Sequence, residues 1–391
     1  MLASKIENIS LSGTMEIAAK TIELKSKGID VIDLCVGEPD LPTPENIKKA
    51  GINAIDHDKT KYTINTGIKE LRQAIADKYK NEWGIDFSID EIIVSNGAKQ
   101  SIYNVLQTII NENEEVLIPA PYYVSYPHMV KLAGGKPVIV ETKRINQYKP
   151  TIDEIASYIS PKSKAIILCN PNNPTGTVLT KKELETIVNF SIEKNLVVIC
   201  DEIYEKLIYN KTEFTSVASF GKKENVIIIN GVSKTYSMTG WRIGYAIGSK
   251  NIVSGMNKLQ SHSTSNACTI SQFASLEALT GDQALVEQQR IIFEERRNLV
   301  YNALKEIELF SCVEPKGAFY IFVDIKKVLE KSDKIADSEE FCMKLLNEAY
   351  VATVPGSVFG KAGYIRISYA KSNKELTEAM IRLKEFVNTI I

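Results

Sequence analysis

The chain has 391 residues, of which 44% are hydrophobic and 24% charged, so it has ordinary globular composition and enough length for two domains. The formal net charge is −1, and no apolar run is long enough to span a bilayer. These values argue against a strongly basic nucleic-acid binder and an integral membrane protein. We therefore expect a cytoplasmic protein that binds neither nucleic acid nor membrane.

The six cysteines and three histidines are scattered, without a CxxC pair or a spacing typical of metal ligands. We expect the cysteines to be small buried residues, and we expect no metal site. Hydrolysis that depends on a histidine has no motif to support it.

The first 30 residues are typical of an amphipathic helix, with Ile17, Ile22 and Leu24 on its apolar side. A short strand over residues 31–36 follows and ends at Gly37, where the missing side chain lets the backbone approach a ligand closely. A simple strand-ending turn is the alternative for Gly37.

Residues 44–57 are predicted to form a helix, and Tyr62 lies in the loop before a second amphipathic helix. From there strands and helices alternate along the chain. This alternation is typical of an α/β fold with a mainly parallel sheet covered by helices on both faces.

A strand at 92–94, a turn with Gly97, Ala98 and Lys99, and a helix over 101–110 form the first corner of this kind. The turn offers free backbone N–H groups to an anion at the start of the helix, such as a cofactor phosphate. Any strand–helix corner shares this property.

Two further loops follow strand ends. Tyr123 follows a strand at 115–119 and can lie flat on a heteroaromatic ring or pack in the core. Residues 170–176, which include Asn173, form a rigid loop directly after a strand, where α/β sheets bind ligands. The Asn173–Pro174 bond is a candidate for a cis peptide.

The strand at 196–200 ends in Asp201. An acid at the end of such an apolar run is costly unless it meets a cation, and a pyridinium nitrogen is such a cation. The alternative is that Asp201 caps the next helix. Tyr204 lies about one helical turn further on.

Lys234 follows a buried strand at 225–230, with Ser233 beside it and Arg242 eight residues later. We interpret Lys234 as the amine that forms a Schiff base with a carbonyl cofactor, and Arg242 as the cation that neutralises its phosphate. The alternative is a surface turn with a solvated lysine.

The remaining sequence predicts mainly helices, including a long one near 284–307, followed by a strand at 317–323 and a strand that carries Arg366. The planar guanidinium of Arg366 suits a carboxylate, and an arginine exposed on an edge strand is the alternative.

Taken together, these motifs resemble those of the class I/II pyridoxal-phosphate-dependent aminotransferases of fold type I, and they are aspartate aminotransferase-like. The resemblance runs from about Thr14 to the C-terminus. It implies a large domain over residues 45–280 with a mainly parallel seven-stranded sheet covered by helices. It also implies a smaller α+β domain built from residues 1–44 and 281–391, which the long helix joins to the large one.

The resemblance also implies the site residues. Catalysis would rest on Lys234 as general base, on Asp201 as partner of the pyridinium nitrogen, and on Tyr204. Pyridoxal 5'-phosphate would be held by Gly97, Ala98, Lys99, Tyr123, Asn173, Asp201, Tyr204, Ser233, Lys234 and Arg242, with Tyr62 from the partner subunit of a homodimer. The substrate would meet Gly37, Lys99, Asn173 and Arg366. Gly231 stands where many members carry a serine, so one phosphate hydrogen bond is either missing or supplied by Ser233.

The activity implied is ping-pong transfer of the amino group of an L-amino acid to a 2-oxo acid. Lys99 matches a lysine of aspartate-preferring members, so aspartate or glutamate donors with 2-oxoglutarate as acceptor are expected first. An aromatic or broad-range aminotransferase stays open, with Tyr126 and Thr14 lining an adaptable pocket. A C–S β-lyase that uses Lys234, Asp201 and Arg366, and a non-catalytic binding protein, also stay open.

Overall fold

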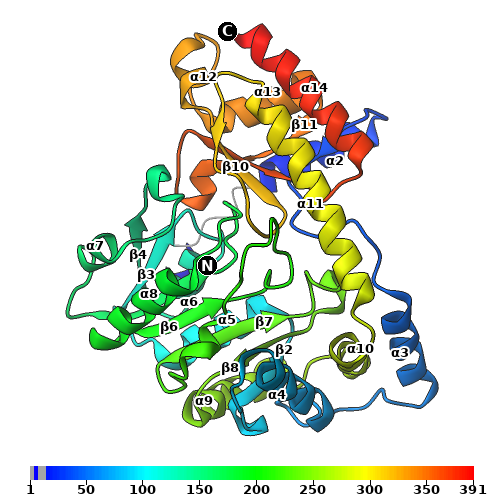
Figure 1. Ribbon diagram of the computed structural model, residues 1–391, viewed down its shortest axis with the longest axis vertical. Helices are drawn as coiled ribbons and strands as arrows, with labels where there is room; N and C mark the ends of the chain where they lie inside the picture. Colours follow the sequence, from blue (N-terminus) through cyan, green and yellow to red (C-terminus); the bar gives the residue numbers. More distant parts are fainter. Residues whose placement is uncertain (1–3, 8–14) are drawn as a thin grey trace.

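A seven-stranded sheet lies at the centre of the computed structural model, which describes residues 4–7 and 15–391 (Figure 1). In spatial order its strands are β2 (Ile92–Ser95), β8 (Gly244–Ile247), β7 (Val226–Gly231), β6 (Val197–Asp201), β5 (Ser163–Cys169), β3 (Glu115–Ala120) and β4 (Lys136–Glu141). Only β8 runs antiparallel to its neighbours. The predicted mainly parallel sheet of seven strands is therefore confirmed.

Helices cover both faces of this sheet, because its central strands are apolar on both sides. In β7, for example, Ile228 belongs to one core cluster while Ile227 and Ile229 belong to the other. The first face packs against α3 (Glu45–Asp56), α4 (Lys69–Trp83), α7 (Ile152–Ala156), α8 (Lys181–Glu193) and α10 (Thr269–Thr280). The second packs against α5 (Ala98–Ile109), α6 (Tyr126–Leu132) and α9 (Lys250–Ser261).

A smaller four-stranded antiparallel sheet lies above the first in Figure 1. Its strands are β12 (Val354–Pro355), β13 (Tyr364–Ser368), β10 (Tyr320–Asp324) and β9 (Ser311–Cys312). A two-stranded parallel pair, β1 (Ile32–Asp33) with β11 (Val351–Ala352), accompanies it. The surrounding helices are α2 (Met15–Ser26), α12 (Lys326–Lys331), α13 (Ser338–Ala349) and α14 (Asn373–Ile390).

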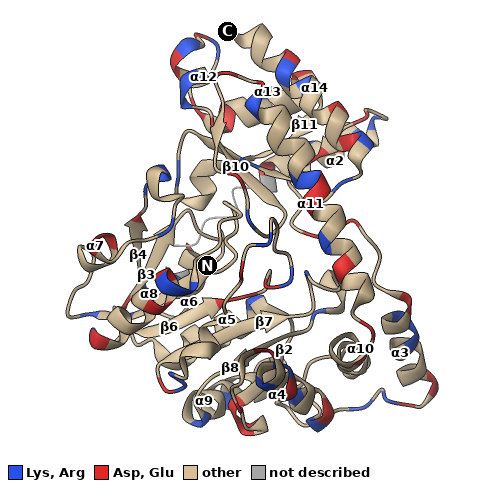
Figure 2. Cartoon of the chain, viewed as in Figure 1, with Lys and Arg blue, Asp and Glu red and all other residues tan. Residues whose placement is uncertain are grey.

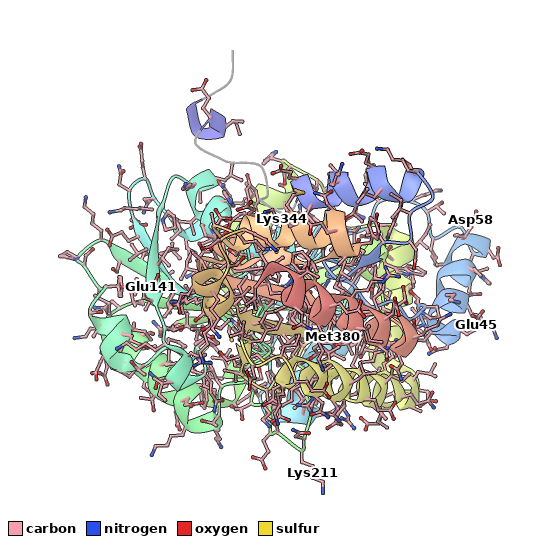
Figure 3. All side chains as sticks on the ribbon, turned by 90° about the horizontal axis from the view of Figure 1, so that it is seen from above. Glu45, Asp58, Glu141, Lys211, Lys344 and Met380 are labelled. Carbon is pink, nitrogen blue, oxygen red and sulfur yellow. The ribbon has the colours of Figure 1, made fainter. Side chains whose placement is uncertain are left out.

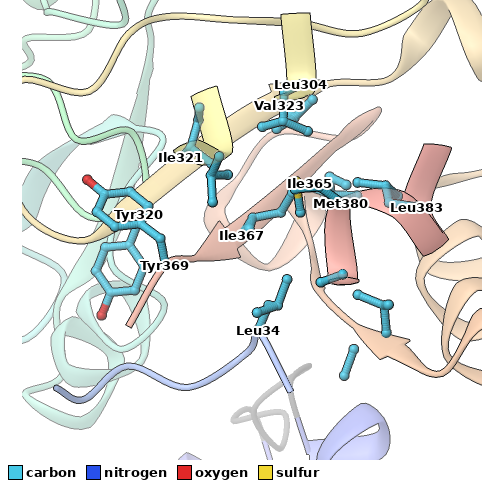
Figure 4. Packing of buried hydrophobic residues seen from close by; sticks show 14 of the residues in the cluster. Leu34, Leu304, Tyr320, Ile321, Val323, Ile365, Ile367, Tyr369, Met380 and Leu383 are labelled. Carbon is cyan, nitrogen blue, oxygen red and sulfur yellow. The ribbon is translucent and has the colours of Figure 1, made fainter. Parts of the chain in front are cut away.

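Early and late parts of the chain share the core around this small sheet. Figure 4 shows Leu34 beside Ile365 and Ile367 of β13, with Met380 and Leu383 of α14 close by. The smaller α+β part is thus built from both termini, as predicted. The residue boundaries of the two domains stay a prediction.

The long helix α11 (Ala284–Lys305) connects the two parts of the molecule (Figure 1). It ends two residues before the predicted end. Short helices α1 (Ser4–Glu7), η1 (Ile89–Glu91), η2 (Arg144–Asn146), η3 (Val217–Phe220), η4 (Thr239–Trp241) and η5 (Gly356–Phe359) complete the described elements.

The apolar side predicted for α2 was partly wrong. Ile17 and Leu24 are buried, but Ile22 is 69% exposed, and Thr21 lies on the buried side instead. The predicted strand at 31–36 is also shorter, because only two residues pair with β11.

Figure 2 shows Lys and Arg positions interspersed with Asp and Glu positions along the helices. In Figure 3 the labelled Lys211 projects from the lower edge of the molecule. Among the described residues, no helix combines the length and the apolarity needed to cross a membrane.

Candidate active site

The carboxyl ends of the parallel strands meet at one edge of the large sheet, and the residues that follow them surround a cavity of about 280 Å³. Its walls include most of the predicted residues: Gly37, Ala98, Lys99, Tyr123, Asn173, Asp201, Tyr204, Ser233, Lys234, Arg242 and Arg366. Cys169, Ile102, Ile203, Thr239, Tyr126 and Tyr320 also line it. The strand order therefore assembles this site from segments far apart in sequence.

Lys234 lines this cavity and is half-buried. Its Nζ donates a hydrogen bond to the carbonyl oxygen of Gly37 at 2.5 Å. Burial lowers the pKa of Lys234 to about 8, against the opposing effect of the Glu38 carboxylate. About a tenth of this amine is thus uncharged at pH 7, far more than for an ordinary lysine, and the uncharged form is the one required of a nucleophile or a base. The interpretation as a solvated surface lysine was wrong.

Asp201 lies at the end of β6 and is 5% exposed. One carboxylate oxygen, Oδ2, accepts from the Tyr126 hydroxyl at 2.7 Å, and the other accepts from the backbone N–H of Ile203 at 3.2 Å. Burial raises the pKa of Asp201 to about 6, and these two hydrogen bonds act in the opposite direction. A cation beside the carboxylate would restore its charge, so the position suits a protonated ring nitrogen.

Arg242 lines the cavity, and Gly97 packs against its guanidinium. The guanidinium donates to the carbonyl oxygens of Thr239 at 2.8 Å and Asn96 at 3.3 Å. Gly97 has φ +90°, and a Cβ there would lie 2.4 Å from Arg242 Nη2. A side chain at position 97 would collide with Arg242, so glycine lets the guanidinium approach the N-terminus of α5. The first N–H groups of this helix and the guanidinium together favour an anion.

Gly231, which stands where a serine was expected, has a packing role. A Cβ on Gly231 would lie 2.8 Å from the carbonyl oxygen of Ile243 in the chain segment before β8. Ser233, by contrast, lines the cavity. A side chain at 231 is therefore disfavoured, and Ser233 is the hydroxyl available to an anion.

Arg366 lines the same cavity from β13. The strand is an inner one, between β12 and β10, and Arg366 is 5% exposed, so the edge-strand alternative was wrong. Its Nη2 donates to the Cys35 carbonyl oxygen at 2.6 Å and its Nη1 to Asn173 Oδ1 at 3.3 Å. Its Nε has no partner among the described residues. A buried guanidinium with a free donor suits a carboxylate ligand.

Asn173 connects Arg366 with a chain of hydroxyl groups. Its Nδ2 lies 3.4 Å from the Tyr204 hydroxyl, which lies 3.1 Å from the hydroxyl of Tyr320. The predicted cis peptide at Asn173–Pro174 is confirmed, and the bonds before Pro121 and Pro171 are also cis.

Tyr123 and Lys99 form a wall of the cavity. The Lys99 Nζ lies 5.5 Å from the centroid of the Tyr123 ring, and no carboxylate in the described chain pairs with it. The Tyr126 ring packs edge-on against Tyr123 at 5.4 Å. Tyr126 thus contacts both Tyr123 and Asp201, rather than only lining a substrate pocket.

Not every predicted residue lines the cavity of this chain, and Gly97 is one that does not. Tyr62 is 90% exposed and is absent from the cavity wall. Thr14 lies outside the described residues. Sequence reasoning missed Tyr320, because nothing in the apolar run around it distinguishes it from a core tyrosine.

Comparison with known proteins places this geometry in context. Residues 29–383 match the family "Aminotransferase class I and II". An aspartate aminotransferase from Bacillus sp. (strain YM-2) is 46% identical over 99% of both chains. A probable aspartate/prephenate aminotransferase from Rickettsia typhi is 44% identical over the full length of both. The crystal structure of an aspartate aminotransferase from Rhizobium meliloti superposes with a TM-score of 0.96 at 37% identity, and all of each chain is covered.

Proposed function

The chain belongs to the class I and II aminotransferases, which use pyridoxal 5'-phosphate, and from this premise we propose that it transfers the amino group of aspartate to 2-oxoglutarate. The observation that carries the proposal is the presence of two separate cations, Arg366 and Lys99, in one cavity of about 280 Å³. Aspartate and 2-oxoglutarate each carry two carboxylates.

The cavity fits the cofactor at several points. Lys234, with its lowered pKa, suits the carbonyl carbon, and the buried acid Asp201 suits the ring nitrogen. Arg242, with the glycine that lets it approach α5, suits the phosphate. Tyr123 would cover the ring face, and Asn173 and Tyr204 would hold the phenolic oxygen, since all three line the cavity.

When bound, pyridoxal 5'-phosphate supplies the electron sink that stabilises a carbanion at the substrate α-carbon. In our proposal Arg366 binds the α-carboxylate of the amino acid and so fixes the direction of its Cα–H bond. Lys234, whose lowered pKa makes the uncharged amine available, would accept the α-proton at Nζ and return it in the course of the transfer. Asp201 keeps the ring nitrogen protonated, with Tyr126 holding its carboxylate in place.

Lys99 would choose the donor, because it lines the cavity without an acidic partner among the described residues, and the proposal assigns the other cavity cations to the cofactor and the α-carboxylate. We expect Lys99→Ala to reduce kcat/KM for aspartate about 10- to 100-fold and to change kcat/KM for alanine or phenylalanine little. Lys131→Ala, which removes an exposed lysine from α6, is the matched control.

The decisive measurement is kcat/KM for a panel of amino acids with 2-oxoglutarate, read as glutamate formed. Aspartate should rank first. An aromatic amino acid in first place would refute the aspartate proposal, and pyruvate with ammonia in the absence of an acceptor would identify a lyase.

We also infer that two copies of the chain complete each site, with Tyr62 reaching the phosphate of its partner. Tyr62 is exposed, yet buried glutamines hold its loop: Gln260 Nε2 donates to the Asn65 carbonyl oxygen at 2.9 Å, and Gln272 Nε2 donates to Thr63 Oγ1 at 3.2 Å. An exposed aromatic on a firmly held loop suits a contact with another chain.

A further inference from the structure

A pair of tyrosine hydroxyls joins the two sheets of the molecule at the cavity. Tyr204 follows β6 of the large sheet, whereas Tyr320 begins β10 of the small one. Their hydroxyl oxygens lie 3.1 Å apart, and their rings meet edge to face with centroids 5.9 Å apart. Both side chains are at least 96% buried, at 4% and 1% exposure. Water therefore has little access to compete for this hydrogen bond.

The surroundings decide which hydroxyl donates. Tyr204 is the one hydrogen-bond partner that the described chain offers to the Tyr320 hydroxyl, so the Tyr320 proton can be satisfied only by donation to Tyr204. Tyr204 also lies within reach of the Asn173 amide, which can only donate from Nδ2. A hydroxyl oxygen that accepts from two donors has its own proton left for a third partner, and the cavity lies on that side.

Arg366 reinforces this direction. Its guanidinium carbon lies 4.4 Å from the centroid of the Tyr320 ring, and a cation over the ring draws electron density from the hydroxyl. Burial raises the pKa of both hydroxyls, and Arg366 opposes this rise at Tyr320. The cation beside the Tyr320 ring therefore favours that hydroxyl as the donor.

We propose that Tyr320 is a positioning residue that donates to Tyr204 and thereby points the Tyr204 proton into the cavity, toward the phenolic oxygen of the bound cofactor. This inference rests on the cofactor site of the proposed function. It adds a residue from the small sheet that acts through Tyr204 rather than on substrate or cofactor.

The contact also gives Gly37 a second reason to be glycine. A Cβ at Gly37 would lie 3.0 Å from the Tyr320 hydroxyl oxygen, tighter than most carbon–oxygen contacts of folded proteins. An alanine at this position would therefore press on the hydroxyl that orients Tyr204.

The test reads the visible absorbance of the chain loaded with pyridoxal 5'-phosphate, without substrate, as pH is changed. A Tyr204 proton that points at the phenolic oxygen withdraws charge from it, and the proton on the lysine-linked nitrogen is then held less tightly. We expect Tyr320→Phe to move the absorbance midpoint upward by about 0.3 to 1 pH unit, and Tyr204→Phe to move it at least as far.

The double variant Tyr204→Phe/Tyr320→Phe shows whether Tyr320 acts through Tyr204 or independently of it. If Tyr320 acts through Tyr204, the double variant has the midpoint of Tyr204→Phe alone. Additive shifts, or an unchanged midpoint in a folded Tyr320→Phe chain, would overturn the proposal. Tyr369→Phe is the matched control: Figure 4 shows Tyr369 beside Tyr320, and its hydroxyl donates to the Ala318 carbonyl oxygen at 3.2 Å, away from the cavity. Its midpoint should equal that of the wild type.

Gly37→Ala provides an independent test should Tyr320→Phe fail to fold. With Tyr204 present, we expect Gly37→Ala to move the absorbance midpoint upward. In the Tyr204→Phe background the same substitution should move the midpoint less, because the displaced Tyr320 then has no hydroxyl to orient. Equal shifts in both backgrounds would contradict the inference. If the chain prefers an amino donor other than aspartate, only the ranking in the substrate panel changes. The absorbance midpoints measured without substrate stay the same.

Discussion

At the scale of single residues, burial sets the acid–base properties on which the site depends. Lys234 loses hydration without gaining a carboxylate hydrogen bond, so its pKa falls from 10.5 to about 8. Asp201 and Glu202, adjacent in sequence, are both buried, but only Asp201 faces the cavity. Asp201 is therefore available to a ligand, whereas the Glu202 carboxylate bonds to Ser216 and Val217 of the chain itself.

The lowered pKa of Lys234 predicts how the cofactor-free chain captures pyridoxal 5'-phosphate. Because only the uncharged amine attacks a carbonyl, the capture rate should rise with pH and level off above the lysine pKa of about 8. Stopped-flow absorbance measured across this pH range checks the midpoint. A rate that still rises toward the ordinary lysine pKa of 10.5 would show that Lys234 is solvated, and Lys234→Ala, which cannot capture, supplies the baseline.

Glu202 predicts a pH-dependent stability. It accepts hydrogen bonds from Ser216 Oγ at 2.6 Å and the Val217 N–H at 2.7 Å, yet burial raises its pKa from 4.5 to about 8. The folded chain keeps this proton while the unfolded chain loses it above pH 4.5, so this contribution to stability is full below pH 4.5 and is lost as pH rises toward 8.

Glu202→Gln should remove this loss. Between pH 5 and 8 the wild-type free energy of unfolding should fall by up to about 1.4 kcal/mol per pH unit more steeply than that of the variant. Urea unfolding at a series of pH values measures both slopes. Parallel slopes would mean that Glu202 is ionised in the folded chain.

Much of the residue-scale site could be predicted from sequence, because Gly97, Asn173, Asp201 and Lys234 each follow an apolar strand of one parallel sheet. Tyr320 could not be, since it enters from a different sheet whose position relative to the first is set by tertiary packing alone.

At the scale of elements, α11 organises the substrate side of the cavity through Arg296. The guanidinium donates to both carboxylate oxygens of Asp40, at 2.6 and 2.9 Å, and so fixes the loop that carries Gly37. The arginine side chain is only 7% exposed. The sequence predicted this helix to within two residues at its C-terminal end but gave no sign of the ion pair, because Asp40 and Arg296 lie 256 residues apart.

Asp40→Asn should destabilise the chain by about 2 to 4 kcal/mol, because it leaves a nearly buried guanidinium without its counter-charge. The freed loop should also raise KM for the amino acid while the rate of cofactor capture stays unchanged. Glu287→Gln is the matched control, because Glu287 pairs with Arg290 on the same helix. The Glu287 side chain is 59% exposed, so the free energy of unfolding should change by no more than about 0.5 kcal/mol. Equal losses for both variants, measured by urea unfolding, would contradict this role of Asp40.

At the scale of the whole molecule, the cavity lies where two sheets meet. The large sheet supplies the acid, the lysine and the anion-binding corner, and the small sheet supplies Arg366 and Tyr320. The alternation of strands and helices predicted the large sheet, since parallel strands need such crossovers. The same pattern could not predict the surfaces that another chain would cover, because an exposed apolar residue cannot be told from a buried one in the sequence.

Those surfaces lead to the last prediction. Ile64 is 59% exposed beside Tyr62, and Ile52 and Ile55 on neighbouring α3 are 57% and 52% exposed. If a second copy covers them, Ile64→Glu places a charge in the interface, and light scattering should show a dimer that dissociates at higher protein concentration than the wild type. Cofactor affinity should fall with it, because Tyr62 would no longer reach its partner. Ile145→Glu, at a site 86% exposed in η2, should stay dimeric. A monomeric Ile64→Glu chain that binds cofactor and turns over normally would show that one chain completes its own site.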